Sequence, residues 1–242
     1  DLYLVKYNFM NKISTRILVS VLTLVFISMN SKSQSNLCFN SSNLIPNAVG
    51  NQPKSISNAD FNGDGKLDIV VANFGSNNIS MLLNTGGGFF ASAINYNVGA
   101  LPFIIKTSDF NEDGKQDVIV TNYNSNNISI LLGNGNGTLQ PQINYPVGSN
   151  PFDLVCADFN GDNHIDIAVT NEMSNNTSIL IGSGLGTFSI STTVLTGSQP
   201  RSIVASDFNG DGKKDLAIVN LGANNVSVYL GNGLGGFSSA LN

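Results

Sequence analysis

Four nine-residue stretches of the chain carry oxygen-bearing side chains at the same alternating positions. The first reads Asp-Phe-Asn-Gly-Asp-Gly-Lys-Leu-Asp at 60–68, and the others occupy 109–117, 158–166 and 207–215. Asp, Asn, Asp and Asp stand at positions 1, 3, 5 and 9 of each stretch. A tight loop of this kind presents side-chain oxygens to a hard cation such as Ca²⁺, and a backbone carbonyl at position 7 supplies one more. The spacing therefore predicts about one calcium ion per loop.

The predicted calcium ligands lie at positions 1, 3, 5, 7 and 9 of each loop, with position 7 acting through its carbonyl. They are Asp60, Asn62, Asp64, Lys66 and Asp68; Asp109, Asn111, Asp113, Lys115 and Asp117; Asp158, Asn160, Asp162, His164 and Asp166; and Asp207, Asn209, Asp211, Lys213 and Asp215.

Ordinary turns are the alternative, because Asp, Asn and Gly are common turn residues. The distribution of acidic residues favours the metal. The chain has 16 Asp and Glu, and twelve of them are positions 1, 5 and 9 of the four loops. Carboxylates so close together repel one another unless a cation lies among them. Position 6 is Gly in the first, second and fourth loops and Asn163 in the third. This pattern indicates a sharp turn with positive φ, a conformation that Asn tolerates.

The segments that follow the loops exclude two other calcium architectures. Position 9 leads directly into β-branched runs such as Ile69-Val-Val-Ala and Val118-Ile-Val-Thr, which are typical of buried strands. An EF-hand would carry Glu at position 12 and flanking helices. The loops begin at 60, 109, 158 and 207, so they recur every 49 residues and not every nine, as calcium β-helix repeats do.

A fixed period near fifty indicates repeated supersecondary units. In the second unit we expect strands at 102–108, 117–122, 128–132 and 139–147, with a hairpin turn at 124–127. Four antiparallel strands in each unit predict an all-β propeller with at least four blades. The glycine-rich stretch 133–137 precedes a strand, which indicates a tight turn and not a phosphate-binding loop. Asn-Xaa-Ser sequences such as Asn127-Ile-Ser have the form of glycosylation sites, but turn chemistry also explains the asparagine.

The loop motif, the strand after it and a proline seven residues before it (Pro53, Pro102, Pro151 and Pro200) together resemble the FG-GAP or VCBS repeat. The resemblance covers residues 36–242. It implies an integrin-α-like calcium-binding propeller of about seven blades, with metal loops on one face and ligand on the opposite one. The family includes adhesion proteins, lectins and accessory domains of extracellular enzymes. The resemblance thus implies a protein or glycan ligand, with a domain of a polysaccharide-active enzyme or a spacer for surface display as alternatives.

Residues 1–35 differ in composition from the repeats. Met10 to Arg16 is cationic, 17–27 is an apolar run of eleven residues, and small residues follow at Ser31, Ser33 and Ser35. The run is too short to span a bilayer, so the pattern predicts a secretory signal peptide and an extracellular or cell-surface location. Export would permit a disulfide between Cys38 and Cys156, but the two lie at unrelated phases of the repeat, and we expect them not to pair.

Few side chains outside the loops could perform catalysis. The only histidine, His164, falls at loop position 7, where the other loops have lysine, and it is interpreted as a spacer. Asp153 and Glu172 are the acids of the repeats that lie outside the loops, and solvated surface positions are the expectation for both. The sequence therefore predicts a binding module and no enzyme.

The charge of the chain argues against nucleic acid as a partner. Its formal net charge is −5, and the 11 Lys and Arg form no basic stripe. Tryptophan is absent, which weakens the case for stacking on sugars, although Tyr96, Tyr123 and Tyr145 could serve as platforms.

Overall fold

A computed structural model describes residues 47–240. The predicted signal peptide, the boundary at residue 35 and Cys38 lie outside the described residues. Within them, no helix has the length and apolarity needed to cross a bilayer.

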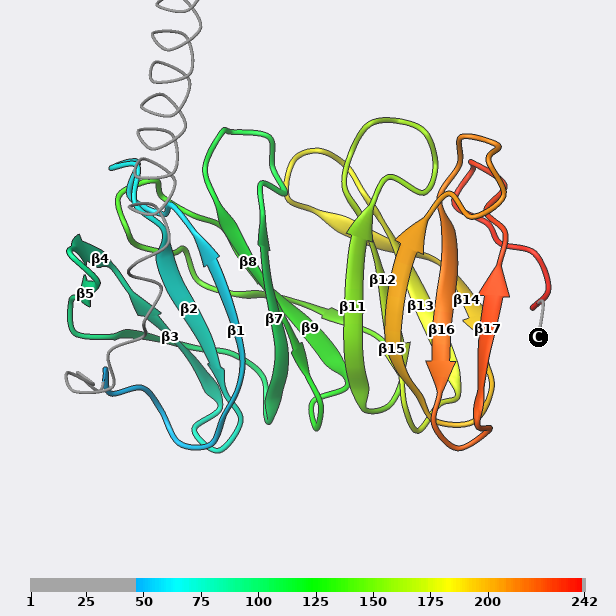
Figure 1. Ribbon diagram of the computed structural model, residues 1–242, viewed down its shortest axis with the longest axis horizontal. Helices are drawn as coiled ribbons and strands as arrows, with labels where there is room; N and C mark the ends of the chain where they lie inside the picture. Colours follow the sequence, from blue (N-terminus) through cyan, green and yellow to red (C-terminus); the bar gives the residue numbers. More distant parts are fainter. Residues whose placement is uncertain (1–46, 241–242) are drawn as a thin grey trace, which may run out of the picture. The chain divides into compact units, whose positions relative to one another are not determined.

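The described residues form four antiparallel sheets, one for each repeat (Figure 1). We number these blades 1 to 4 in chain order. Blade 1 contains β1 (Pro53–Ala59), β2 (Asp68–Asn73), β3 (Asn78–Leu82) and β6 (Ile94–Asn97), and blade 2 contains β7 (Pro102–Ser108), β8 (Asp117–Asn122), β9 (Asn127–Leu131) and β10 (Ile143–Pro146). Blade 3 contains β11 (Pro151–Ala157), β12 (Asp166–Asn171), β13 (Asn176–Gly182) and β14 (Phe188–Leu195), and blade 4 contains β15 (Pro200–Ser206), β16 (Asp215–Asn220) and β17 (Asn225–Tyr229). A small hairpin of β4 (Asn84–Gly86) and β5 (Phe89–Phe90) extends blade 1.

The predicted propeller architecture is confirmed, and in the second repeat so are the bounds of the first two strands. The fourth strand was predicted at 139–147 but pairs only over Ile143–Pro146. The residues before it form the glycine-rich turn, in which Asn134 N donates to Thr138 O at 2.9 Å and only one isolated bridge, Gly133 to Leu139, follows. A tight turn was therefore the correct interpretation of 133–137.

The hydrophobic core lies between blades. Three clusters of buried side chains each join two consecutive blades. Blade 1 contributes Phe61, Val70, Ala72, Ile79 and Met81 to the first cluster, and blade 2 contributes Ile105, Val118, Val120 and Leu131. We call the surface formed by Phe61 and its companions the trailing face of a blade, and the surface formed by Ile105 and its companions the leading face. Blades 1 to 3 thus each bury their trailing face against the leading face of the next blade.

A buried asparagine network ties the second and third strands together in every blade. In blade 2, Asn122 Nδ2 donates to Asn127 Oδ1 at 2.7 Å and to Ser129 Oγ at 2.8 Å. Ser129 is fully buried and donates in turn to Asn144 Oδ1 at 2.6 Å. The two contacts of the amide nitrogen recur at Asn73, Asn171 and Asn220. Strand-pairing hydrogen bonds therefore account for the Asn-Xaa-Ser sequences.

Candidate metal loops and the opposite face

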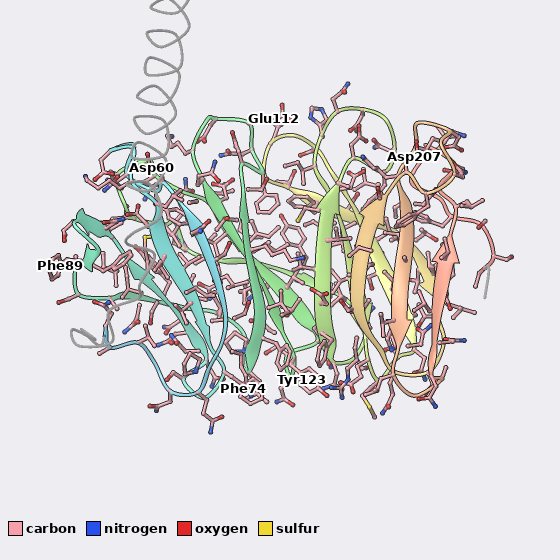
Figure 2. The ribbon with its side chains drawn as sticks, viewed as in Figure 1. Asp60, Phe74, Phe89, Glu112, Tyr123 and Asp207 are labelled. Carbon is pink, nitrogen blue, oxygen red and sulfur yellow. The ribbon has the colours of Figure 1, made fainter. Side chains whose placement is uncertain are left out.

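The four predicted metal loops join the first strand of each blade to the second. They lie at one end of the sheets, where Asp60, Glu112 and Asp207 are found, while Phe74 and Tyr123 lie at the other end (Figure 2). The four loops are therefore neighbours on one face of the molecule.

The position 1 aspartate organises each loop by collecting backbone N–H groups. The Asp60 carboxylate accepts from Gly63 N at 2.8 Å, from Asp64 N at 3.2 Å and from Gly65 N at 2.8 Å. Asp207 makes the equivalent contacts, which hold its pKa below the ordinary value, and the hydrogen bond from Gly212 N contributes most to this shift. These contacts close the loop around the carboxylate.

Position 6 turns as its residue type predicts. Gly65, Gly114 and Gly212 have φ of 80°, 80° and 83°, and Asn163 has φ of 68°. The prediction that Asn163 adopts the left-handed conformation is confirmed.

Position 5 has a cationic partner in three loops. Lys66 Nζ lies 2.8 Å from Asp64 Oδ2, Lys115 Nζ lies 2.9 Å from Asp113 Oδ2, and the equivalent pair in the fourth loop is 3.8 Å apart. The lysine hydrogen bonds hold the pKa of Asp64 and of Asp113 below the ordinary value. Position 7 therefore supplies a charge as well as a carbonyl, which offsets part of the repulsion among the carboxylates. That side-chain role was missed in the sequence.

Position 9 is buried in every loop. The four aspartates, Asp68, Asp117, Asp166 and Asp215, are fully inaccessible to solvent. In the third loop, Asp166 Oδ2 accepts from Phe159 N and Oδ1 accepts from Gly182 N, both at 2.8 Å. Burial raises the pKa of Asp117 and of Asp166 above the ordinary value, although these N–H groups oppose the shift. The carboxylate thus ties the start of the loop to the end of the third strand.

The donor chemistry of the loops fits a hard cation at positions 1, 3 and 5. Asn62 Nδ2 donates to Asp64 Oδ2 at 3.3 Å. Asp60 and Asn62 are half-buried and Asp64 is exposed, and all three carry side-chain oxygens of the kind that bind Ca²⁺. Across residues 47–240, no group of three or more His, Cys, Asp or Glu side chains is gathered as a metal site. The ligand sets given above stay predictions, and the structure adds backbone hydrogen bonds as a further role for position 9.

His164 and Glu112 form an ion pair between neighbouring loops. His164 Nδ1 lies 2.5 Å from Glu112 Oε1. Glu112 stands at position 4, where the other three loops have glycine, and its φ is 59°. The exceptional residue at position 4 of the second loop and the one at position 7 of the third are therefore partners. The interpretation of His164 as a spacer missed this contact, because the contact depends on the arrangement of adjacent blades.

We expect this pair to make stability depend on pH near neutrality. The Glu112 hydrogen bond raises the pKa of His164 above 6.5. A raised folded pKa contributes stability that is present below pH 6.5 and is lost as pH rises through the folded pKa. Because the chain has one histidine, proton NMR without added calcium reports this group alone. Glu112→Gln should lower the measured pKa; an unchanged pKa would contradict the pairing.

The end opposite the loops carries an aromatic cluster that spans all four blades. Phe103 packs 4.5 Å from Phe152 and 6.1 Å from Phe74 between ring centroids, and Arg201 stacks 4.7 Å from the Phe152 ring. We define the aromatic cluster as Phe74, Phe103, Tyr123, Phe152, Glu172 and Arg201.

Glu172 is the buried carboxylate of this cluster. It is only 3% exposed, and it accepts from Tyr123 Oη at 2.8 Å and from Arg201 at 2.5 and 3.1 Å. The expectation of a solvated Glu172 is wrong, because the next blade covers it. Asp153 also differs from its expectation, since it is half-buried and accepts from Ile203 N at 3.2 Å across a blade boundary.

The three tyrosines proposed as sugar platforms do not share one rim. Tyr123 lies in the aromatic cluster, whereas Tyr96 accepts a hydrogen bond from Leu139 N, and the Tyr145 hydroxyl donates to Gly186 O, between blades.

Cys156 is a free thiol in the structure, and burial raises its pKa to about 12.

A model of the FG-GAP-like repeat family matches residues 60–106, 109–169 and 158–218. The chain belongs to this family. Its matched segments contain all four loops, so the resemblance given by the loop motif and the upstream prolines is confirmed. No curated protein matches the sequence of this FG-GAP-like repeat chain.

Solved structures share the fold at low sequence identity. A protein from Lactobacillus plantarum is 14% identical with a TM-score of 0.62, over 81% of this chain and 57% of its own. The periplasmic gluconolactonase PpgL of Pseudomonas aeruginosa is 15% identical with a TM-score of 0.54, over 76% and 52%. BBS1N, solved in complex with ARL6DN, is 14% identical with a TM-score of 0.53, over 79% and 56%. The FG-GAP-like repeat chain therefore spans about half the length of these structures.

Proposed function

We propose that this chain is a calcium-binding propeller module of an exported protein, which binds a protein or glycan ligand without catalysis. The observation that carries the proposal is the separation of two sites. Oxygen-rich loops occupy one end of the sheets, and the aromatic cluster occupies the other (Figure 2). The loops suit a hard cation, and the cluster offers rings, a guanidinium and a hydroxyl to a ligand.

Calcium would be held by the oxygens of positions 1, 3 and 5 and the position 7 carbonyl, with position 9 behind them. Its contribution would be to hold the loops, and with them the blade boundaries, in one conformation. Millimolar calcium outside cells would fill weak sites of this kind, which supports an extracellular location together with the apolar run at 17–27.

The exposed side chains of the aromatic cluster favour a macromolecular ligand. Phe103, Tyr123 and Phe152 are half-buried, so their free edges can gain contact area while their packed sides keep them in place. The complex of BBS1N with ARL6DN supports protein binding as one use of this fold.

Calorimetric titration with Ca²⁺ tests the metal half of the proposal. We expect several sites with Kd on the order of 10⁻⁴ M, as in other extracellular modules. Absence of both heat and thermal stabilisation would overturn the calcium assignment.

In the second arm, arrays of extracellular glycans and matrix proteins are probed with the chain and with Phe103→Ala. Binding that Phe103→Ala leaves intact would place the ligand elsewhere.

A further inference from the structure

The glycine-rich turn that follows the third strand of each blade carries one residue at its tip, between two glycines. This residue is Gly87, Asn136, Leu185 and Leu234 in blades 1 to 4. Leu185 is 76% exposed and Leu234 is 80% exposed, and with Leu195, at 78%, they are the most exposed large hydrophobic residues that the structure describes. Because blades 1 and 2 have Gly87 and Asn136 at the same place, the turn itself does not need leucine there.

The two turns keep their shape through backbone contacts. Leu185 N donates to Ser183 Oγ at 3.2 Å, and Leu234 N donates to Asn232 Oδ1 at 2.8 Å. Neither contact involves a leucine side chain. A polar residue at the tip therefore leaves the turn intact, as Asn136 does in blade 2.

Leu185 lies between the second and third metal loops. Gly186 N donates to the carbonyl of Phe110 in the second loop at 3.1 Å, and a side chain at Gly184 would collide with His164 in the third loop. The turn between β13 and β14 accordingly reaches the same end of the sheets as these loops (Figure 1).

Leu234 is placed in the same way between the third and fourth loops. Gly235 N donates to the carbonyl of Phe159 in the third loop at 3.0 Å, and a Cβ at Gly233 would lie 3.2 Å from the Lys213 side chain in the fourth. Metal loops and apolar tips therefore alternate along one face of the molecule.

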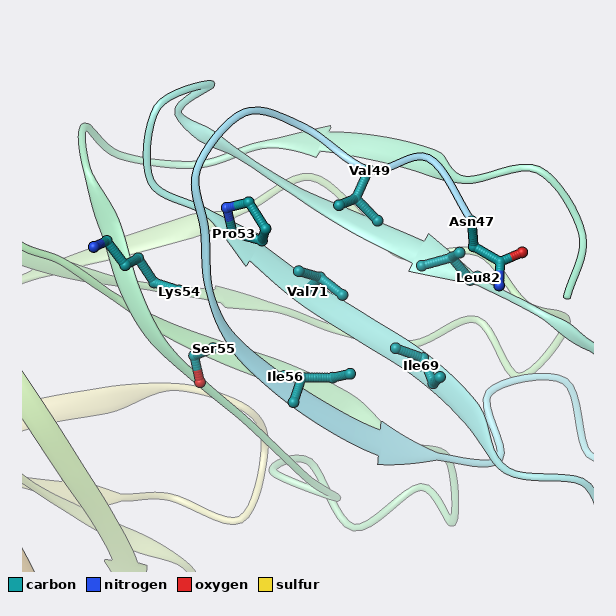
Figure 3. A pocket seen from close by; sticks show the side chains of 9 residues that line it. All are labelled: Asn47, Val49, Pro53, Lys54, Ser55, Ile56, Ile69, Val71 and Leu82. Carbon is teal, nitrogen blue, oxygen red and sulfur yellow. The ribbon is translucent and has the colours of Figure 1, made fainter. Parts of the chain in front are cut away.

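The apolar hollow on blade 1 differs from the tips, because it is the packing face of a blade. Ile56, Ile69 and Val71 line this hollow of about 460 Å³ on the leading face (Figure 3). The equivalent positions of blades 2 to 4 are buried against the preceding blade. The leucine tips belong to no such face, so contacts between blades do not explain them.

The surroundings of the tips favour a lipid bilayer over a protein as their partner. The third metal loop separates Leu185 from Leu234, so the two side chains form no continuous apolar patch of the kind that marks a protein interface. Separate apolar side chains can enter the acyl boundary of a bilayer while the polar loops between them stay at the level of the headgroups.

The charge of the loops makes contact with an anionic bilayer depend on calcium. The four loops contain thirteen acids and four lysines, a net charge of −9 with His164 neutral, so they repel anionic headgroups. Calcium reverses the sign of this interaction. If each of the five groups of a loop gives one oxygen, a phosphate oxygen of a headgroup can complete the six to eight that Ca²⁺ takes.

We propose that Leu185 and Leu234 insert into an anionic phospholipid bilayer when the loops beside them bind calcium. The proposal rests on the calcium-binding function proposed above and gives the loop face a partner of its own. The aromatic cluster lies at the other end of the sheets (Figure 2), so a docked chain directs it away from the bilayer, where a ligand can reach it.

Sedimentation of the full chain with vesicles of phosphatidylcholine and phosphatidylserine, in calcium and in chelator, tests the proposal. We expect binding in calcium that Leu185→Asn combined with Leu234→Asn weakens at least about tenfold, since burial of each leucine is lost. Leu195→Asn is the matched control. Leu195 is as exposed, but it pairs with Asn176 at the end of β14 opposite the loops, and its variant should bind like the unmodified chain. The apolar run at 17–27 is present in every protein compared, so the differences report the tips.

A fluorescence measurement reports insertion of one tip directly. The chain has no tryptophan, so Leu185→Trp supplies its only indole. We expect the emission of this variant to move to shorter wavelength when vesicles and calcium are both present, and to return when chelator is added. The emission of Leu195→Trp should stay unchanged.

The outcomes separate this proposal from the calcium assignment. Calorimetric calcium binding together with a Leu185→Trp emission that ignores vesicles would overturn membrane insertion and leave the calcium-binding function standing. Absence of calcium binding would overturn both. A double asparagine variant that binds vesicles in calcium as strongly as the unmodified chain, or an equal shift for Leu195→Trp, would also contradict insertion of the tips.

Discussion

Asp166→Asn is expected to destabilise the protein by about 2 to 4 kcal/mol whether or not calcium is present, because it removes a buried acceptor from two backbone N–H groups. Both Asp166 oxygens accept hydrogen bonds at 2.8 Å, from Phe159 N and Gly182 N. An asparagine offers one acceptor oxygen and points an N–H donor at the other N–H. The free energy of unfolding should therefore fall in chelator as well as in calcium.

Asp162→Asn in the same loop is the matched control. Asp162 lies at position 5 on the exposed part of the loop, where Asn160 Nδ2 and His164 N donate to it. If calcium binds there, this variant should keep its melting temperature in chelator and lose part of the gain that calcium gives. Urea denaturation of both variants, with calcium and with chelator, separates the roles. An Asp166→Asn protein as stable as the unmodified one in chelator would show that position 9 acts only through the metal.

The fold could be predicted from the sequence because every blade repeats one local pattern with a period of 49 residues. Strand-forming runs directly after position 9 and the prolines before the first strands set the first two strands of a blade. The fourth strand was less accurate, since its start depends on where the glycine-rich turn ends. Asn163 was interpreted correctly because the left-handed conformation is a property of one residue and its turn.

Two of the contacts that sequence analysis missed cross between blades. His164 and Glu112 are 52 residues apart, and Glu172 and Arg201 are 29 apart, so neither pair belongs to a local motif. One signal was present in the sequence. Glu112 is the only residue other than Gly at position 4 of the four loops, His164 is the only residue other than Lys at position 7, and the two lie in adjacent loops. The hydrogen bonds of position 9 were not predicted, because spacing cannot distinguish a carboxylate that faces a cation from one that faces backbone N–H groups; its assignment to the metal stays a prediction.

Removing the Glu172 carboxylate should have the second large effect. Glu172→Ala deletes the acceptor of three hydrogen bonds and leaves the Arg201 guanidinium over Phe152 without its counter-ion. Because the Arg201 side chain is 40% exposed, solvent screens part of the charge interaction. We expect a loss of about 2 to 4 kcal/mol in the free energy of unfolding, measured by urea denaturation.

The chain itself supplies the control for this experiment, because the same boundary is apolar two repeats earlier. Phe74 and Phe103 occupy the positions of Glu172 and Arg201 between blades 1 and 2, at 6.1 Å between ring centroids. Replacing a buried ion pair with packed apolar side chains is often neutral or stabilising, whereas removing one partner is costly. Glu172→Phe combined with Arg201→Phe should therefore recover most of the stability that Glu172→Ala loses. The double variant could instead fail to recover stability while Glu172→Ala is strongly destabilised. That result would mean that the ion pair stabilises this boundary more than apolar packing does, and that the aromatic cluster depends on its ion pair for its structure.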